Sequence, residues 1–125
     1  MAVQTEIERD REMPRLMSFM LTKEQIEART KTVTRRLGWW FLKPGDLLWA
    51  CEKCMGLKKG EKVKKICLIR IVATRPEPLN TISEKECVRE GFPGMLPHEF
   101  IEMFCKFNRC TPHTIVNRIE FKYET

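Results

Sequence analysis

The chain has 125 residues, enough for one domain, and its 42% hydrophobic content is enough to fill one core. No stretch approaches the ~20 apolar residues of a membrane-spanning helix, and the charged N-terminal residues lack the apolar segment of a signal peptide. We therefore expect a cytoplasmic protein that does not enter a membrane. Its six cysteines are expected to be reduced thiols rather than a disulfide framework.

Positive charge is concentrated in the middle of the chain. The net charge is +6, but residues 29–75 hold 13 basic and 3 acidic side chains, while residues 1–28 hold 4 and 6 and residues 76–125 hold 6 and 8. Such a concentration favours an anionic partner, most commonly a polyphosphate backbone. The lysines of residues 58–65 are equally typical of a solvated hairpin. They are Lys58, Lys59, Lys62, Lys64 and Lys65.

The first half of the chain predicts a short helix followed by strands. Residues 1–15 lack apolar periodicity, so we expect a loosely ordered arm before a single domain spanning residues 16–125. Thr22 and Gln25 match a capping box, which predicts that their side chains bind free amides at the start of a helix running to about residue 29. Residues 32–34 favour a strand, and residues 43–46 form a turn signal.

The second half alternates strands with amphipathic helices. Strands are predicted at residues 47–50, at residues 65–73, where both faces are apolar and expected to be buried, and at residues 114–123, where alternation predicts a half-buried strand. One helix is predicted to begin at Ser83, with Glu86 completing a capping box, and to end at Gly91. Another begins at Pro97, with four large apolar residues on one face. These elements predict an α+β fold built on a small, partly open β-barrel.

Four segments, taken in order, resemble the ASCH family, whose fold is similar to the PUA domain. They are Lys31-Thr32-Val33-Thr34-Arg35-Arg36, Lys43-Pro44-Gly45-Asp46, Glu90-Gly91-Phe92 with the following helix, and Arg118-Ile119-Glu120-Phe121. The resemblance spans about residues 16 to 124. It implies a small PUA-like β-barrel with peripheral short helices, and a role with RNA or modified nucleosides. A fold alone does not fix an activity.

Certain small bacterial members of that family remove the acyl group from N4-acetylcytidine with a lysine, a threonine and a glutamate. The resemblance places these roles on Lys31, Thr34 and Glu90 of this chain. The lysine and threonine match a Lys-Thr-x-Thr-x-Arg stretch, while the glutamate is matched by its position relative to a helix. The implied substrate is N4-acylcytidine or a related modified nucleoside, and the implied chemistry needs neither a metal nor another cofactor.

The residue types also suit amide hydrolysis on chemical grounds. A threonine hydroxyl becomes a nucleophile only when a base takes its proton, and the developing oxyanion needs a positive or hydrogen-bonding partner. Burial and nearby arginines would lower the pKa of Lys31 toward that of a general base. Glu90 would oppose this shift by stabilising the ammonium, and it is expected either to orient Lys31 or to protonate the leaving amine. Substrate or RNA binding is assigned to Arg29, Arg35, Arg36, Trp39 and Trp40.

Other interpretations of these residues stay open at this point. Lys31 also suits the end of a helix, and Thr34 suits an ordinary strand position. Trp39 and Trp40 would point to opposite faces of an extended segment, one toward the core and one offering a stacking surface for a base. The same basic segment fits a non-catalytic RNA-binding ASCH module, with Arg35 and Arg36 on phosphates or paired with the acidic C-terminal segment. A third possibility is an accessory protein that binds an acidic partner.

The Cys51-Glu52-Lys53-Cys54 segment has the two-residue spacing of a zinc knuckle. A structural zinc site needs four ligands, and the remaining candidates are spaced less favourably. Those candidates are Cys105, Cys110, His98 and His113. Because the resemblance requires no metal, we predict that none is bound. Redox chemistry is not expected either, since no βαβ pattern surrounds the pair.

Overall fold

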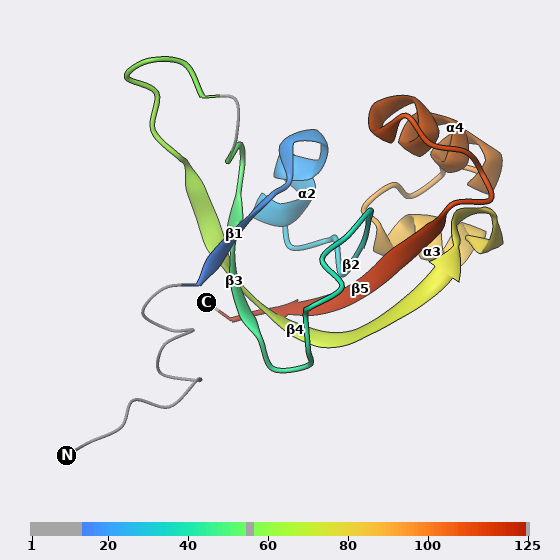
Figure 1. Ribbon diagram of the computed structural model, residues 1–125, viewed down its shortest axis with the longest axis horizontal. Coiled ribbons are helices and arrows are strands. Elements are labelled where there is room, and N and C mark those ends of the chain that lie inside the picture. The colour runs from blue at the N-terminus through green and yellow to red at the C-terminus, as the bar shows by residue number, and fades with distance from the viewer. Residues whose placement is uncertain (1–13, 55–56, 125) are drawn as a thin grey trace.

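A computed structural model describes residues 14–54 and 57–124 (Figure 1). The expectation of a loosely ordered arm concerns residues that, up to residue 13, lie outside this described part. The described chain folds into one sheet with short helices packed against it. The elements are β1 (Arg15–Ser18), η1 (Met20–Thr22), α2 (Lys23–Glu27), β2 (Val33–Arg36), β3 (Leu47–Cys51), β4 (Lys65–Pro78), η2 (Leu79–Thr81), α3 (Glu84–Arg89), α4 (Pro97–Asn108) and β5 (Ile115–Tyr123).

The sheet has five strands in the order β1-β3-β4-β5-β2. β1 pairs with β3 in parallel, and the other neighbours are antiparallel. β4 and β5 are long and curved, so the sheet curls into an open barrel whose edge strands are β1 and β2 (Figure 1). A register shift between Ile71 and Ala73 marks an irregularity in β4, a common way to bend a strand. The predicted α+β architecture, a partly open barrel with peripheral short helices, is confirmed.

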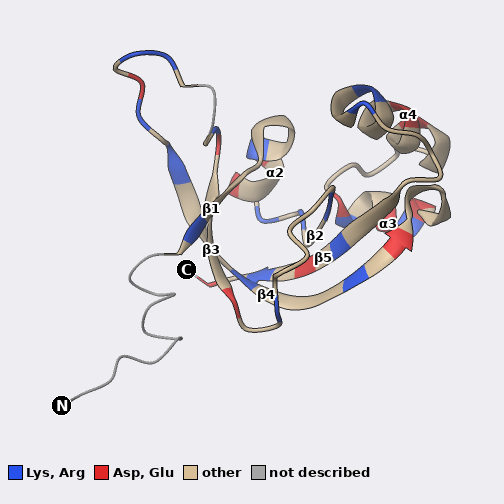
Figure 2. Ribbon diagram, viewed as in Figure 1, with Lys and Arg blue, Asp and Glu red and all other residues tan. Residues whose placement is uncertain are grey.

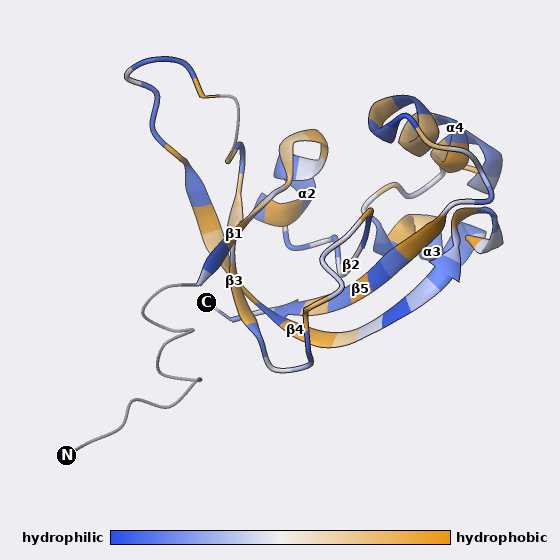
Figure 3. Cartoon of the chain, in the orientation of Figure 1, coloured by the Kyte–Doolittle hydropathy of each residue, from blue (hydrophilic) through white to orange (hydrophobic). Residues whose placement is uncertain are grey.

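Two apolar cores lie along this sheet, and Figure 3 shows them as orange bands on β3, β4, β5 and α4. The first is formed by Met17, Phe19, Ile26, Leu48, Ile69, Ile71, Ile119 and Phe121, among others. The second is formed by Leu79, Ile82, Cys87, Phe100, Phe104 and Val116. Burial of this apolar surface is the main favourable contribution to folding. Among the described residues, no helix is both long and apolar enough to cross a membrane.

Several local signals in the sequence predict the structure correctly. The Ser83 hydroxyl accepts a hydrogen bond from the Glu86 amide at 3.2 Å, as expected at the start of α3. Pro97 opens α4, where its missing N–H costs nothing. In the turn at residues 43–46, the Lys43 amide donates to the Asp46 carboxylate at 2.9 Å. Local chemistry therefore fixes both helix starts and the turn before β3.

The capping box predicted at Thr22 and Gln25 is wrong. The Thr22 side chain makes no capping hydrogen bond where η1 runs directly into α2, and the Thr22 amide that Gln25 was expected to bind is already bonded to the Phe19 carbonyl at 3.0 Å. Gln25 instead donates from Nε2 to the Gly91 carbonyl at 3.2 Å, so a tertiary contact replaces the local one. The helix ends at Glu27, earlier than predicted.

The strand predictions need three corrections. Arg15, assigned to the arm, begins β1, a strand too short to show a pattern in sequence. β4 continues to Pro78 and is buried mainly on one face, because the helices pack against that face while Val72 and Ala73 are exposed. By contrast, residues 116–119 of β5 are buried on both faces. The face of β5 that carries Arg118 is covered by α3, and Arg118 pairs there with Glu86 of that helix.

Candidate functional site

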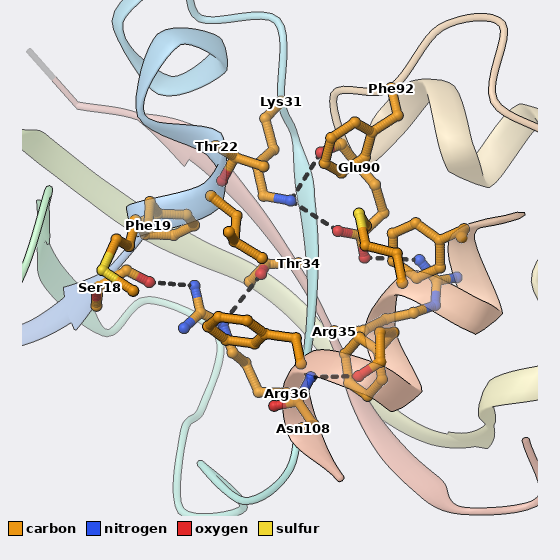
Figure 4. A pocket seen from close by; sticks show the side chains of 16 residues that line it. Ser18, Phe19, Thr22, Lys31, Thr34, Arg35, Arg36, Glu90, Phe92 and Asn108 are labelled. Atoms are coloured by element: carbon orange, nitrogen blue, oxygen red, sulfur yellow. Dashed lines mark hydrogen bonds and ion pairs between the residues drawn. The ribbon is translucent and has the colours of Figure 1, made fainter. Parts of the chain in front are cut away.

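A pocket of about 240 Å³ lies between the two cores, bounded by η1, β2, the end of α3 and the inner face of α4 (Figure 4). One part of its lining is polar and is formed by Thr22, Lys31, Thr34, Arg35, Arg36 and Glu90. The facing part is apolar and is formed mainly by Phe92, Phe100, Met103, Phe104 and Phe107. An apolar cavity with a few converging polar groups is the usual form of a small-molecule site.

Lys31 and Glu90 form a buried pair at the base of this pocket, each side chain 3% exposed. Lys31 Nζ donates to Glu90 Oε1 and to the Glu90 carbonyl oxygen, both at 2.7 Å. The backbone around Lys31 is fixed by two bonds. The Thr32 amide donates to the Arg89 carbonyl at 2.8 Å, and the Tyr123 hydroxyl donates to the Lys31 carbonyl at 2.6 Å. The lysine is therefore held against the end of α3 by both its side chain and its main chain.

Arg35 holds the second oxygen of Glu90. Its Nη1 donates to Glu90 Oε2 at 3.0 Å, while its Nη2 donates to Glu77 and Glu86 at 2.8 Å each. Glu86 in turn accepts from Arg118 and Arg89, and these guanidinium groups hold the pKa of Glu86 well below its usual range. Arg35 thus pairs with the acidic C-terminal segment, one of its two expected roles, and its donors are directed at carboxylates.

Thr34 and Arg36 lie two residues apart on β2 and therefore share a face of the strand. Arg36 Nε donates to Thr34 Oγ1 at 3.1 Å, and its Nη2 donates to the Ser18 carbonyl at 2.7 Å. Its guanidinium lies 4.7 Å from the centre of the Phe19 ring. Burial lowers the pKa of Arg36 to about 10, so the group stays charged at neutral pH. Thr34 Oγ1 consequently faces a fixed positive charge.

The pKa of Lys31 is lowered from its usual value. Burial is the main cause, the charge of Glu90 opposes it, and Arg36 and Arg35 lower the pKa further. Within the described part of the chain, Lys31 Nζ bonds to Glu90 and not to Thr34. Hydrogen bonds between catalytic groups often form fully only when substrate is bound, so this arrangement is compatible with a later transfer of a proton between them.

Five of the eight residues singled out in the sequence line the pocket: Lys31, Thr34, Arg35, Arg36 and Glu90. The other three lie outside it. The Arg29 guanidinium is 5.4 Å from the centre of the Tyr123 ring. Trp39 packs against the first core, and Trp40 is 54% exposed beside it. This is the split between one inward and one outward tryptophan that the sequence allowed, but neither ring reaches the pocket.

Sequence reasoning does not assign the other pocket residues to a site. The apolar face of α4 is recognisable from its periodicity, but periodicity cannot distinguish a core face from a pocket wall. Phe92 follows the Glu90-Gly91 pair directly, so the segment that carries the resemblance already contains it. Thr22 has the sequence context of a helix cap. Only the tertiary structure brings Ser18 and Asn108 to the same cavity.

The cysteines do not combine into a cluster. Among the described residues, no group of three or more His, Cys, Asp or Glu side chains is placed to hold a metal ion. Cys105 and Cys110 have their sulfur atoms 3.9 Å apart beside the second core, whereas Cys51 lies on β3 in the sheet. That the protein needs no metal stays a prediction.

No protein-family model and no curated protein matches the sequence. Solved structures that are similar in fold include the following two. A protein of family DUF984 from Enterococcus faecalis V583 superposes with a TM-score of 0.61 at 15% identity, covering 89% of this chain and 80% of that one. The ASCH domain from Lactobacillus crispatus JV V101 superposes with a TM-score of 0.58 at 16% identity, covering 97% of this chain and 86% of that one. The resemblance found in the sequence is thus confirmed at the level of the fold. With its curled five-stranded sheet and short peripheral helices, the chain has the ASCH fold, an α+β fold of the PUA-like type.

Proposed function

We propose that the protein hydrolyses the exocyclic amide of N4-acylcytidine or a related modified nucleoside. The observation that carries the proposal is that Lys31, Thr34 and Glu90 line one small pocket whose opposite wall is aromatic. These are the three residue types implied by the sequence resemblance, and Glu90 comes from a part of the chain far from the segment that holds Lys31 and Thr34. The volume of about 240 Å³ lies below the ~300–1,000 Å³ of sites for drug-sized ligands, which suits a single base.

Thr34 is the proposed nucleophile. Its Oγ1 attacks the acyl carbonyl carbon while neutral Lys31 takes the hydroxyl proton, and the C=O electron pair becomes the oxyanion. Arg36 donates to Thr34 Oγ1 in the free protein, so its positive charge stands next to the site where negative charge develops. A fixed charge in a buried site stabilises such a transition state more than it would in water.

Collapse of the intermediate breaks the bond between the acyl carbon and N4. The Lys31 ammonium then returns its proton to the departing amine, which leaves as cytidine. Water hydrolyses the acyl-threonine, releases the carboxylic acid and restores Thr34. Over the cycle one amide and one water become one acid and one amine, with no other reactant.

Glu90 is proposed to orient Lys31. Both its carboxylate oxygens are already occupied, one by Lys31 and one by Arg35, which leaves it poorly placed to protonate a leaving group. Of the two roles expected from the sequence, the geometry therefore favours orientation. The half-buried ring of Phe92 and the exposed ring of Phe107 offer apolar surface against which a pyrimidine can stack.

The test is an assay of purified protein with N4-acetylcytidine, following the release of cytidine and acetate. Thr34→Ala, Lys31→Ala and Glu90→Ala should each lower turnover by orders of magnitude, and double variants should lose little more, because residues that act as a unit are non-additive. Thr32→Ala is the matched control, since Thr32 is exposed on the same segment. Absence of turnover above the Lys31→Ala protein across roughly pH 6–9 would contradict the proposal and leave the non-catalytic RNA-binding module as the better interpretation.

A further inference from the structure

Thr22 lines the same pocket, and neither the sequence motif nor the resemblance gives it a role there (Figure 4). The residue is only 6% exposed. Its hydroxyl has no hydrogen-bond partner among the described residues, and it does not cap α2. Every fully buried side-chain nitrogen or oxygen in the described part of the chain does have a partner. The Thr22 hydroxyl therefore keeps its small accessible surface, and the pocket is the cavity that the residue lines.

Covering this unpartnered hydroxyl completely would be costly, because desolvation of a polar group is repaid only by a hydrogen bond. Natural structures rarely keep such a group without a reason. Valine has nearly the same shape as threonine and would remove the cost. A ligand that hydrogen-bonds to the hydroxyl would explain why a polar side chain lies here.

We infer that Thr22 is a substrate-binding residue, whose hydroxyl donates to a hydrogen-bond acceptor on the edge of the pyrimidine ring. This inference rests on the proposed function, because it takes the ligand to be a cytidine. The pyrimidine would stack on the apolar wall, with the acyl group at Thr34 and the ring edge toward η1. N3 and O2 of cytosine are both acceptors, so a single hydroxyl donor matches either of them. Thr22 thus binds and positions the base and takes no part in proton transfer.

The experiment is a titration of the full-length protein with cytidine, the stable product, followed by NMR chemical shifts. Thr22→Val replaces the hydroxyl with a methyl group of similar size and should weaken cytidine binding roughly 3- to 10-fold, the range for one neutral hydrogen bond. Thr22→Ser keeps the hydroxyl and should bind as the wild type does. Thr22→Ala is a second variant without the hydroxyl, and Thr32→Val repeats the same chemical change at an exposed position.

Thermal unfolding without ligand separates this role from a structural one. The Thr22→Val protein should melt at the wild-type temperature or above it, whereas a lost helix cap would lower the melting temperature. Wild-type affinity for cytidine in both Thr22→Val and Thr22→Ala would overturn the inference while leaving amide hydrolysis intact. Absence of cytidine binding and of turnover by the wild-type protein would overturn this inference and the proposed function together.

Discussion

At the scale of single residues, the site depends on a balance around Lys31. Burial and two arginines lower the pKa of Lys31, and the carboxylate of Glu90 raises it. A general base works best when its pKa lies near the working pH; burial and the arginines shift the pKa of Lys31 in that direction, and Glu90 opposes the shift. Glu90 also fixes the position of Nζ through two bonds, so one residue sets both the geometry and the charge.

The variant Glu90→Gln tests this balance. A glutamine keeps an acceptor for Lys31 but removes the negative charge that raises the pKa of Lys31. The pKa of the lysine should then fall further, and the acid limb of kcat/KM should move to lower pH, while the rate itself declines because Lys31 is held less firmly. The measurement is the pH profile of kcat/KM for N4-acetylcytidine. Glu84→Gln, the same change at an exposed position of α3, is the control. An acid limb that stays in place or moves upward would show that it does not report Lys31.

At the scale of elements, the C-terminal end of α3 connects the helices to the site. Glu86 and Glu90 are four residues apart and lie on one face of the chain, where they accept from arginines of β2 and β5. Just after the helix, Gly91 has a φ of +98°, and an added Cβ would lie 2.8 Å from Gln25 Cγ and 3.4 Å from Lys31 Cβ. α2, α3 and the lysine segment thus meet at a point that admits only glycine.

We expect Gly91→Ala to lower both stability and activity. Gly94 is a matched control, because its φ of +86° is also in the left-handed region but an added Cβ would meet nothing within 4 Å. Gly94→Ala should cost only the backbone strain, about 1–2 kcal/mol. Gly91→Ala should cost more, because Gln25 must move as well, and it should also lower kcat/KM by disturbing Lys31. Urea unfolding measures the two free energies. Equal losses in both variants would mean that the contact with Gln25 is unimportant.

The elements also show what sequence can and cannot predict. Ser83, Pro97 and the Lys43–Asp46 turn are predictable because their signals are local. β1 is not, since four residues with one buried side chain carry no usable period. The candidate site is predictable in part. The Lys-Thr-x-Thr-x-Arg stretch leads to Lys31 and Thr34. Arg35, however, donates hydrogen bonds to three carboxylates that are far away in sequence, and the sequence pattern does not reveal these partners.

At the scale of the whole molecule, the basic middle segment divides into two parts. Lys31 and Arg35 are buried and paired with carboxylates, so these two charges are neutralised within the protein. Lysines of the loop between β3 and β4 stay exposed, and Figure 2 shows them in blue at the far end of the molecule from α3 and α4. We therefore place the expected attraction of a polyanion and the proposed chemistry on a nucleoside in different regions.

This separation predicts independent effects on the two properties. Replacing Lys58, Lys59 and Lys62 with alanine should leave kcat/KM for N4-acetylcytidine unchanged, because none of these side chains lines the pocket. If single-stranded RNA binds to the loop, the same variant should bind it more weakly, and the negative slope of log affinity against log salt should become shallower by roughly 0.7 for each phosphate that the protein no longer neutralises. The control replaces Lys85, Lys106 and Lys122 with alanine. These lysines are exposed outside the loop, and replacing them removes the same amount of positive charge. If the slope becomes equally shallow in the control, the effect is due to net charge and not to the loop. A fall in nucleoside turnover on changing the loop lysines would contradict the separation of the two regions.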